Sequence, residues 1–422
     1  MKIGEKIRKA RKEAVSLTPF IGKGHPDFIW KGHADFGQRE NLDLEGYIGE
    51  AVNGLFQQGF DPKHVTRGYI GNFAGELFNQ QGHLGAMVSR TTPELAGVGI
   101  GRCEAACASG GIALMSAAEA VCAGHDVVLV AGAECQTTVK ARDGGEYLAR
   151  AAHFKEERPI DDFTFPALFA RRIKAYHEKY GLPLSELGYF TMKAMENARK
   201  NPLAHMKKNK WDLESACSAG DHNPNFLANE ELKDYLRMSD CSQVTDGGAA
   251  LLLCSEEGLQ KLGLSKDKAV KLRSYHLATN PLGRTADLTR MDTAALAFCR
   301  TFTDGEVKLA DVGVAEVHDC FTIAELLMME AMGLEEPGKG IEAVKSGKTA
   351  LDGSLPVNTG GGLVGFGHPV GATGVKQAAE IFRQMKGLCG DYQLKNNPDL
   401  GLMANMGGDD RTCFVGLFEN VN

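Results

Sequence analysis

Short runs of apolar and β-branched residues recur along the chain beside glycines, and this pattern predicts buried strands. Between these runs, apolar residues recur at the spacing of a helix. The alternation of strands and helices predicts an α/β fold whose sheets are covered by helices. The predicted strands are Asp126–Ala131, Ala249–Leu253, Val270–Ser274, Val312–Val317, Gly401–Asn405 and Cys413–Phe418, and the predicted helices are Leu44–Phe56, Ser109–Ala123, Ile323–Met332 and Thr373–Met385.

The region 140–240 has a different pattern, with runs of charge and with helical periodicity around Leu168–Tyr180 and Leu184–Lys200. We interpret this region as an insertion that lies over the α/β body. Its basic run, Lys207–Lys210, is either a contact for a polyanionic cofactor tail or an ordinary solvated face, and the sequence leaves both open.

The two halves of the chain contain segments of similar sequence pattern. Ala105–Ala123 is a glycine-bearing turn of small residues that enters a helix, and Gly365–Met385 repeats this arrangement. The repetition predicts two related α/β units that face each other.

Composition narrows the class of protein. A chain of 422 residues with net charge −7 has no general attraction to nucleic acid or to an anionic membrane. No apolar run reaches the roughly 20 residues of a membrane span, and the charged N-terminus has no apolar signal segment. The eleven cysteines lack the spacing of a disulfide framework or of a zinc site. We therefore expect a cytoplasmic protein with no nucleic-acid partner, no membrane partner and no metal.

Cys107 is the first candidate for chemistry, because it stands in the small-residue run Glu104–Gly111 at the entrance to a predicted helix. Backbone N–H groups and the helix dipole at such a position favour a thiolate. In contrast, five other cysteines fall in apolar patterns that predict core positions, namely Cys122, Cys135, Cys254, Cys299 and Cys413.

His368 is the second candidate, since it stands in a glycine-rich stretch, 360–374, just before a helix. Imidazole is the usual base for activating a thiol, with a pKa near working pH. His318 and Cys320 follow a predicted strand, where α/β sites collect, and predict a hydrogen-bond donor and a second acid/base. Gly407, in a stretch after another predicted strand, presents a backbone N–H for an oxyanion.

Together these stretches resemble the thiolase family over nearly the whole chain, and most closely its sterol-carrier-protein-type branch. Cys107 matches the family's nucleophile and Gly367–Pro369 its Gly-His-Pro loop. Two departures, His318–Phe321 in place of Asn-Glu-Ala-Phe and Asn405–Gly407 in place of Cys-x-Gly, are shared by that branch. There the second reactive cysteine comes from the His-Asp-Cys-Phe segment, so the resemblance implies that Cys320 is the acid/base.

The resemblance also implies the five-layered α-β-α-β-α fold of two fused halves. The implied divisions are an N-terminal half at 1–139 plus 241–268, a loop domain at 140–240 that holds coenzyme A, and a C-terminal half at 269–422. Ser242 aligns with a residue near the pantetheine arm. The segment Gly24–Glu40 carries no motif that can be placed.

The implied activity is that of a thiolase, which cleaves or forms a 3-ketoacyl-CoA through an acyl-Cys107 intermediate. Coenzyme A and acyl-CoA are substrates, no cofactor is tightly bound, and a homodimer or homotetramer is expected. Three alternatives stay open: a ketoacyl-synthase-like condensing enzyme, a subunit that needs a small accessory partner, and an acyl-CoA-binding scaffold.

Overall fold

The computed structural model describes residues 42–421 and the backbone of 15–21, so the segment Gly24–Glu40 lies outside the described residues. All six predicted strands are present, as β4 (Val127–Glu134), β5 (Gly247–Cys254), β6 (Val270–Thr279), β7 (Val314–Glu316), β8 (Leu400–Gly407) and β9 (Thr412–Asn420). Three further strands were not predicted: β1 (Val15–Ile21), β2 (Arg67–Gly71) and β3 (Gly99–Cys103). The last two are five residues long and contain two glycines each, so they lack a distinct apolar run.

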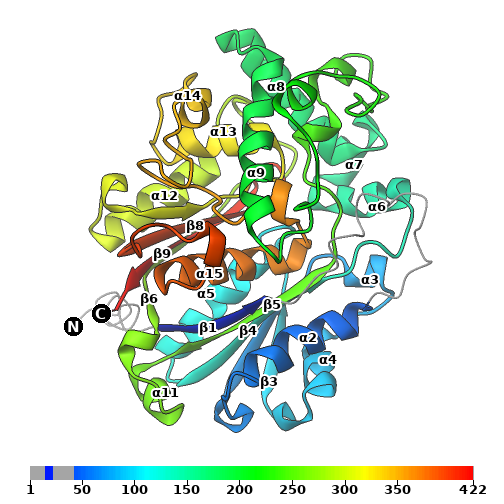
Figure 1. Cartoon of the computed structure of the whole chain (residues 1–422). Coiled ribbons are helices and arrows are strands. Elements are labelled where there is room, and N and C mark those ends of the chain that lie inside the picture. The colour runs from blue at the N-terminus through cyan, green and yellow to red at the C-terminus, as the bar shows by residue number, and fades with distance from the viewer. Residues whose placement is uncertain (1–14, 22–41, 422) are drawn as a thin grey trace.

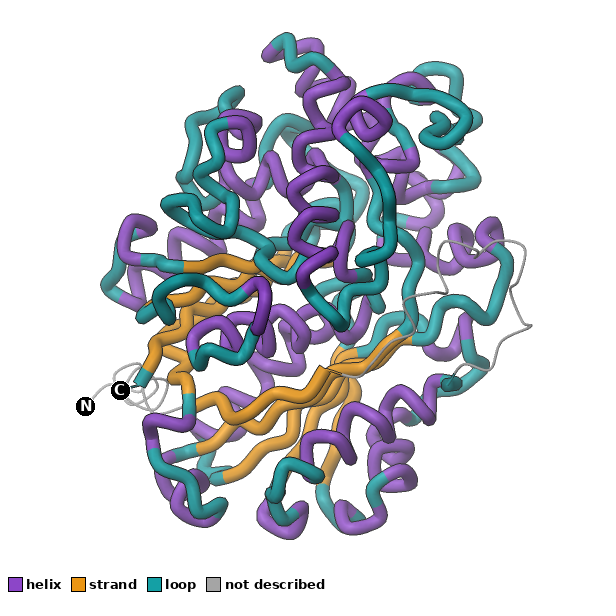
Figure 2. Tube along the Cα trace, in the orientation of Figure 1, coloured by secondary structure: helices purple, strands orange, loops and turns teal. Residues whose placement is uncertain are grey.

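Hydrogen bonds join the strands in the order β3-β2-β4-β5-β1-β6-β9-β8-β7. β1 pairs antiparallel with β5 and, through Val15 and Ser16, with β6. In space the strands form two layers that meet at β1 and β6, with helices between them (Figure 1, Figure 2). The continuous pairing therefore links two sheets, one from each half of the chain.

Helices fill the space between the two sheets and cover both outer faces. α5 (Ser109–Cys122) and α15 (Thr373–Met385) lie between them and share one apolar core with both sheets. α2 (Leu44–Phe56) and α4 (Leu84–Thr91) cover the first sheet. α12 (Asp292–Gly305) and α13 (Thr322–Ala331) cover the second. This arrangement confirms the predicted five layers.

The two halves repeat one topology. β4 is parallel to β2 and antiparallel to β5, and β8 is parallel to β7 and antiparallel to β9. α5 precedes β4, as α15 precedes β8. The resemblance between Ala105–Ala123 and Gly365–Met385 is thus a structural repeat, and it sets the starts of two helices side by side at the centre.

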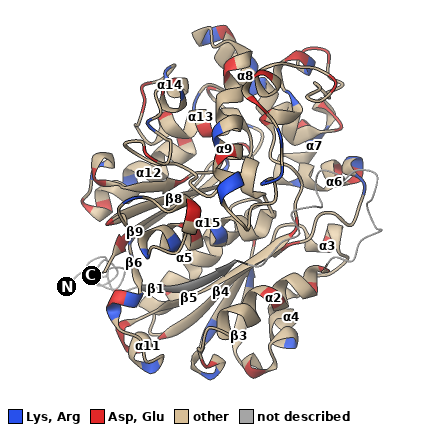
Figure 3. Cartoon of the chain, viewed as in Figure 1, with Lys and Arg blue, Asp and Glu red and all other residues tan. Residues whose placement is uncertain are grey.

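The chain between β4 and β5 forms helices that lie outside the two sheets (Figure 1). They are α6 (Ala141–Leu148), α7 (Phe154–Glu157), α8 (Thr164–Tyr180), α9 (Gly188–Lys200) and α10 (Leu213–Cys217). Positions of Lys and Arg are interspersed with positions of Asp and Glu along these and the other outer helices (Figure 3). No helix in residues 42–421 is long and apolar enough to cross a membrane.

The cysteine predictions are right for three of five positions. Cys135, Cys254 and Cys413 are buried, whereas Cys122 is partly exposed and Cys299 is exposed. Cys299 was wrongly predicted to be in the core because it lies in an apolar run. That run forms the amphipathic helix α12, whose buried face carries Thr293, Ala294, Ala297, Phe298, Thr301 and Gly305 and leaves Cys299 toward solvent.

Candidate active site

Cys107 lies in the tight turn between β3 and α5, two residues before the helix begins, as predicted. Ala106 adopts a left-handed φ of 52°. The Ser109 hydroxyl closes the turn by accepting the Ala105 N–H at 3.0 Å and donating to the Ala106 carbonyl at 2.6 Å. Cys107 is half-buried as a residue, so the turn holds it at the edge of the core rather than fully inside it.

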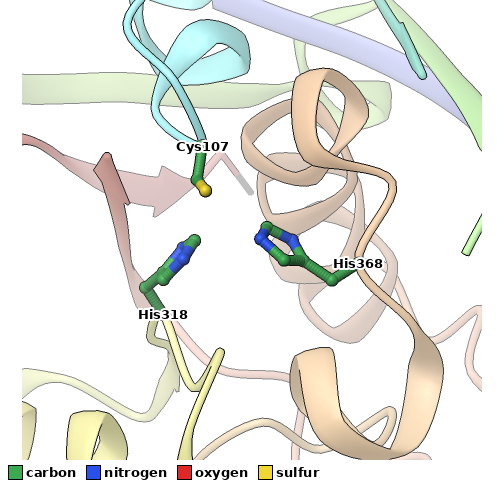
Figure 4. Close-up of side chains that lie close together, drawn as sticks. All are labelled: Cys107, His318 and His368. Carbon is green, nitrogen blue, oxygen red and sulfur yellow. The ribbon is translucent and has the colours of Figure 1, made fainter. Parts of the chain in front are cut away.

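His318 and His368 meet Cys107 from the other half of the chain. His318 follows β7 and His368 stands five residues before α15. The sulfur and one nitrogen of each imidazole all lie within 4.8 Å of one another. The two rings are edge to face, with centroids 5.1 Å apart (Figure 4). The three residues predicted from separate stretches therefore form one cluster.

A Cys–His–His set is also a donor set that zinc accepts. The expectation of no metal rested on spacing along the sequence, which cannot detect three donors whose successive separations are 50 and 211 residues (368 − 318 and 318 − 107). The absence of a metal therefore stays a prediction for experiment.

The hydrogen bonds of His368 determine its tautomer. Its Nδ1 lies 2.7 Å from the Thr373 hydroxyl, and that hydroxyl donates its hydrogen to the Pro369 carbonyl at 3.0 Å. Thr373 must therefore accept, and Nδ1 carries the proton. The Nε2 atom of His368 is buried without a hydrogen-bond partner, so its lone pair is available within the cluster.

His318 has the opposite tautomer, set by Asn405 at the end of β8. The Asn405 amide nitrogen donates to the Cys107 carbonyl at 2.9 Å and lies 3.5 Å from Nδ1 of His318. The Asn405 oxygen accepts the Gly111 N–H at 3.0 Å. Since Nδ1 of His318 accepts, its proton is on Nε2, and this ring is a hydrogen-bond donor.

Burial dominates the electrostatics of the cluster. It lowers the pKa of His368 to about 3 and, with the neighbouring His368, lowers the pKa of His318 well below its usual range. Burial raises the pKa of Cys107 to about 12; Glu134 raises it further and the Gly408 N–H opposes the rise.

These shifts correct two expectations from the sequence. The start of α5 does not make Cys107 a resting thiolate, and the pKa of His368 is far below working pH. Desolvation disfavours both charged forms, so the unliganded site holds a neutral thiol and two neutral imidazoles.

A cavity of about 370 Å³ opens onto this cluster. Cys107, Cys320 and His368 line it, together with Ser242 and Gly408. Much of the remaining wall is apolar, and no Lys, Arg, Asp or Glu lines it among residues 42–421. Its apolar lining includes Phe73, Leu148, Phe163, Phe165, Phe226, Val244, Phe321 and Val370.

Ser242 and Cys320 are brought together in the cavity wall. The Ser242 N–H donates to the Cys320 carbonyl at 2.8 Å, and Cys241 forms a β-bridge with Phe321. Burial raises the pKa of the Cys320 thiol, and Cys107 raises it further. The second thiol is therefore protonated in the unliganded site, next to the first.

Gly407 and Gly408 have different surroundings. Gly407 is the last residue of β8 rather than part of a loop after it, and a Cβ there would collide with the Ala105 carbonyl oxygen. Gly408, which the sequence analysis did not single out, lines the cavity with its N–H toward the Cys107 sulfur.

Asn405 and Thr373 are further contributors that the sequence analysis did not assign. Asn405 stands two residues before the glycine pair Gly407–Gly408, and this position was the available signal. Thr373 is the first residue of a predicted helix, and nothing in the sequence distinguishes it from an ordinary helix start.

Comparison with known proteins identifies the family. The family model described as "Thiolase, N-terminal domain" matches residues 38–257. The model described as "Thiolase C-terminal domain-like" matches residues 275–418. An acetyl-CoA acetyltransferase of Methanothermobacter thermautotrophicus is 34% identical over 385 residues, 91% of this chain and 96% of the relative. Sterol carrier protein 2 of Oryctolagus cuniculus is 31% identical over 57% of this chain and 43% of its own.

Among solved structures, the "Ltp2-ChsH2(DUF35) aldolase" has a TM-score of 0.77 and 19% identity, over 97% of this chain and 98% of that one. This likeness shows the fold. The chain belongs to the thiolase family. It is an acyltransferase enzyme. The resemblance to the thiolase family and its sterol-carrier-protein-type branch is confirmed.

Proposed function

We propose that the protein cleaves or forms the carbon–carbon bond of a 3-ketoacyl-CoA through an acyl-Cys107 intermediate. The observation that carries this proposal is that the protonation states of the clustered side chains complement one another. A neutral thiol, an unprotonated Nε2 on His368 and an Nε2–H on His318 lie together beside the Cys320 thiol. They form a nucleophile, its base, a donor and a second acid.

In the cleavage direction, His368 Nε2 takes the Cys107 proton as the sulfur attacks the 3-keto carbon. The bond between C2 and C3 then breaks, and Cys320 protonates the departing enolate of acetyl-CoA. Cys320 recovers its proton from a second coenzyme A, whose sulfur attacks the acyl group on Cys107. His368 returns its proton to the departing Cys107 sulfur, so protons and bonds balance over the cycle.

Negative charge develops on two oxygens, one in the enolate and one in the tetrahedral intermediate, and different hydrogen-bond donors stabilise each of them. The Nε2–H of His318 serves the enolate oxygen. The backbone N–H of Cys107 donates a hydrogen bond to the oxyanion of the tetrahedral intermediate. A second backbone N–H, from Gly407 or Gly408, donates to the same oxygen. Such a donor contributes about 10²–10³-fold in kcat. We assign the second donor to Gly408, because Gly408 lines the cavity and Gly407 packs against the turn.

The remaining assignments follow from the family likeness. Coenzyme A enters as a substrate, with Ser242 near its pantetheine arm and region 140–240 over it, and no cofactor is tightly bound. A cytoplasmic homodimer or homotetramer is part of the proposal. The name of the DUF35-containing structure supports testing a small accessory subunit as well.

The test mixes purified protein with acetoacetyl-CoA and coenzyme A, and follows acetyl-CoA release and the mass of the intact chain. Wild type and Cys299→Ala, which removes an exposed cysteine, should both form product and carry an acetyl adduct. Cys107→Ala should do neither. An adduct that persists on Cys107→Ala would contradict the assignment.

The same assay, repeated after chelation and with metal analysis, tests the Cys–His–His set as a metal site. Full activity in metal-free protein is expected. If wild type forms neither adduct nor product with acetoacetyl-CoA or a longer 3-ketoacyl-CoA, the scaffold or accessory-subunit alternatives replace this proposal.

A further inference from the structure

The turn 408–411 between β8 and β9 is anchored by three consecutive side chains, although it is only four residues long. The Asp410 carboxylate accepts the N–H groups of Thr293 at 2.9 Å and Ala294 at 3.0 Å, at the start of α12. Arg411 donates to the Pro281 carbonyl at 2.9 Å. Asp409 and Asp410 are 2% and 5% exposed. All three charged side chains of this turn are therefore buried.

Asp409 pairs with Arg172 of α8, which is fully buried. The Arg172 guanidinium also donates to the carbonyls of Leu288 at 3.0 Å and Arg290 at 2.8 Å. Arg171 approaches the second Asp409 oxygen at 3.5 Å. A buried ion pair is often no more stabilising than apolar residues of the same size, so its presence beside a reactive turn indicates a role in geometry.

One face of α8 connects this pair to the substrate cavity. Phe165 and Pro166 line the cavity. Phe169 stacks on Phe321, with ring centroids 4.2 Å apart and planes 19° apart. Arg172 follows three residues later. Spacings of three and four residues place side chains on the same face of a helix, so a single rigid element contacts the cavity, the Cys320 segment and the β8–β9 turn.

Gly408 connects the anchored turn to the active site, because it precedes Asp409 in the chain and lies beside Cys107. It has a left-handed φ of 66° and lines the cavity with Cys107. We propose that the Arg172–Asp409 pair is a positioning pair, which fixes the β8–β9 turn so that the Gly408 N–H points at the oxyanion formed above Cys107. This inference rests on the proposed acyl-Cys107 chemistry.

The test uses Arg172→Gln, Asp409→Asn and the double variant. Arg172→Gln leaves the buried Asp409 carboxylate with only the more distant Arg171, and Asp409→Asn leaves the buried Arg172 guanidinium without a carboxylate. Each single variant should therefore lower both the thermal midpoint and kcat. The double variant removes both charges, so its midpoint should recover. Its kcat should remain about 10²-fold down, as for loss of one oxyanion donor, with KM changed less than about threefold because no substrate contact is removed.

Arg172→Lys provides a milder change, because lysine keeps the charge but lacks the planar fork whose separate nitrogens bind the carboxylate and the two carbonyls. It should fold and still show reduced kcat. The matched control is the exposed pair Glu45–Arg90, 2.8 Å apart on α2 and α4. Changing both of its members to Gln should leave kcat unchanged.

Single-turnover acylation, followed by the mass of the chain, locates the effect, which should lie in formation of acyl-Cys107. If kcat and acylation recover together with the midpoint in the double variant, the pair is structural only and the inference is overturned. Normal kcat in folded Arg172→Lys would overturn it as well. A wild-type chain that forms no acyl-Cys107 would defeat the proposed function instead, so the two failures are distinguishable.

Discussion

At the scale of single residues, His318 and His368 differ in tautomer although their rings are in contact. Thr373 leaves Nε2 of His368 as an acceptor, and Asn405 leaves Nε2 of His318 as a donor. Since neither ring is protonated at neutral pH, the direction of each hydrogen bond is set by a neighbour that never reacts. Activity should therefore depend on Thr373 as well as on the histidines.

Thr373→Val tests this dependence, because valine matches threonine in shape but cannot accept from Nδ1. We expect kcat to fall at least about tenfold, as for a misdirected general base, while KM changes little. Thermal stability should fall as well, because the Nδ1–H of His368 and the Pro369 carbonyl both lose a buried partner. Thr349→Val, at another buried threonine remote from the cluster, serves as the control. A Thr373→Val enzyme with unchanged kcat would show that packing alone fixes the tautomer.

The pKa of His368 also predicts a dependence of stability on pH. The unfolded chain protonates this imidazole below its ordinary value of 6.5, whereas the folded chain does so only near pH 3. The unfolded state binds more protons in that window, so the free energy of unfolding must fall as pH drops through it, by at most about 5 kcal/mol.

Glu134, whose pKa burial raises to about 7, contributes with the opposite sign, since the folded state holds that proton. The measurement is therefore a difference: urea unfolding of wild type and His368→Gln between pH 7 and 4. The variant should lose less stability on acidification. Parallel curves would mean that His368 has an ordinary pKa.

At the scale of elements, the end of β8 packs closely against the backbone of the turn that holds Cys107. Gly407→Ala places a methyl group against the Ala105 carbonyl and 3.1 Å from the Ala108 nitrogen. Because the obstacle is backbone, we expect a loss of about 1–3 kcal/mol in the free energy of unfolding, with loss of activity. Gly101→Ala in β3, where the nearest atom is 3.8 Å away, should change neither strongly. A fully stable Gly407→Ala protein would contradict the close packing.

The elements themselves were predictable to a different degree in different layers. β4, β5, β8 and β9 were predicted because strands buried on both faces read as continuous apolar runs. α15 was predicted at both ends, since its periodicity is bounded by glycines before it and Lys386-Gly387 after it. β2 and β3 were missed because two glycines interrupt the apolar run in each of them. In β2, Gly71 packs against the backbone of Ser109 and Gly110.

The candidate site could likewise be predicted from the sequence only in part. The sequence analysis found Cys107, His318, Cys320 and His368, because each stands in a stretch with a distinctive composition. Thr373 and Asn405 were not predicted. Cys107 was expected to favour the thiolate and His368 to have a pKa near working pH, whereas burial raises the pKa of Cys107 and lowers the pKa of His368. Tautomers and desolvation arise from packing between the two halves, which no local pattern contains.

At the scale of the whole molecule, the cavity restricts the acyl group. Its described wall has no charged side chain, and an unpaired buried carboxylate costs several kcal/mol. We expect 3-ketohexanoyl-CoA to be cleaved with a kcat/KM at least about 100-fold above that of 3-ketoadipyl-CoA, which has the same chain length and a terminal carboxylate. Equal values would place the acyl group outside this cavity.

The assembly of the cluster from both halves has a consequence for biosynthesis. Cys107 and Gly408 are 301 residues apart (408 − 107), which at about 5–20 residues per second is roughly 15–60 seconds of translation. During that interval the nascent chain contains its nucleophile without the second oxyanion donor, and until His368 is made it also lacks the base. A partly made chain therefore meets cellular thioesters with an ordinary cysteine, and acylation begins only when the second half has folded against the first.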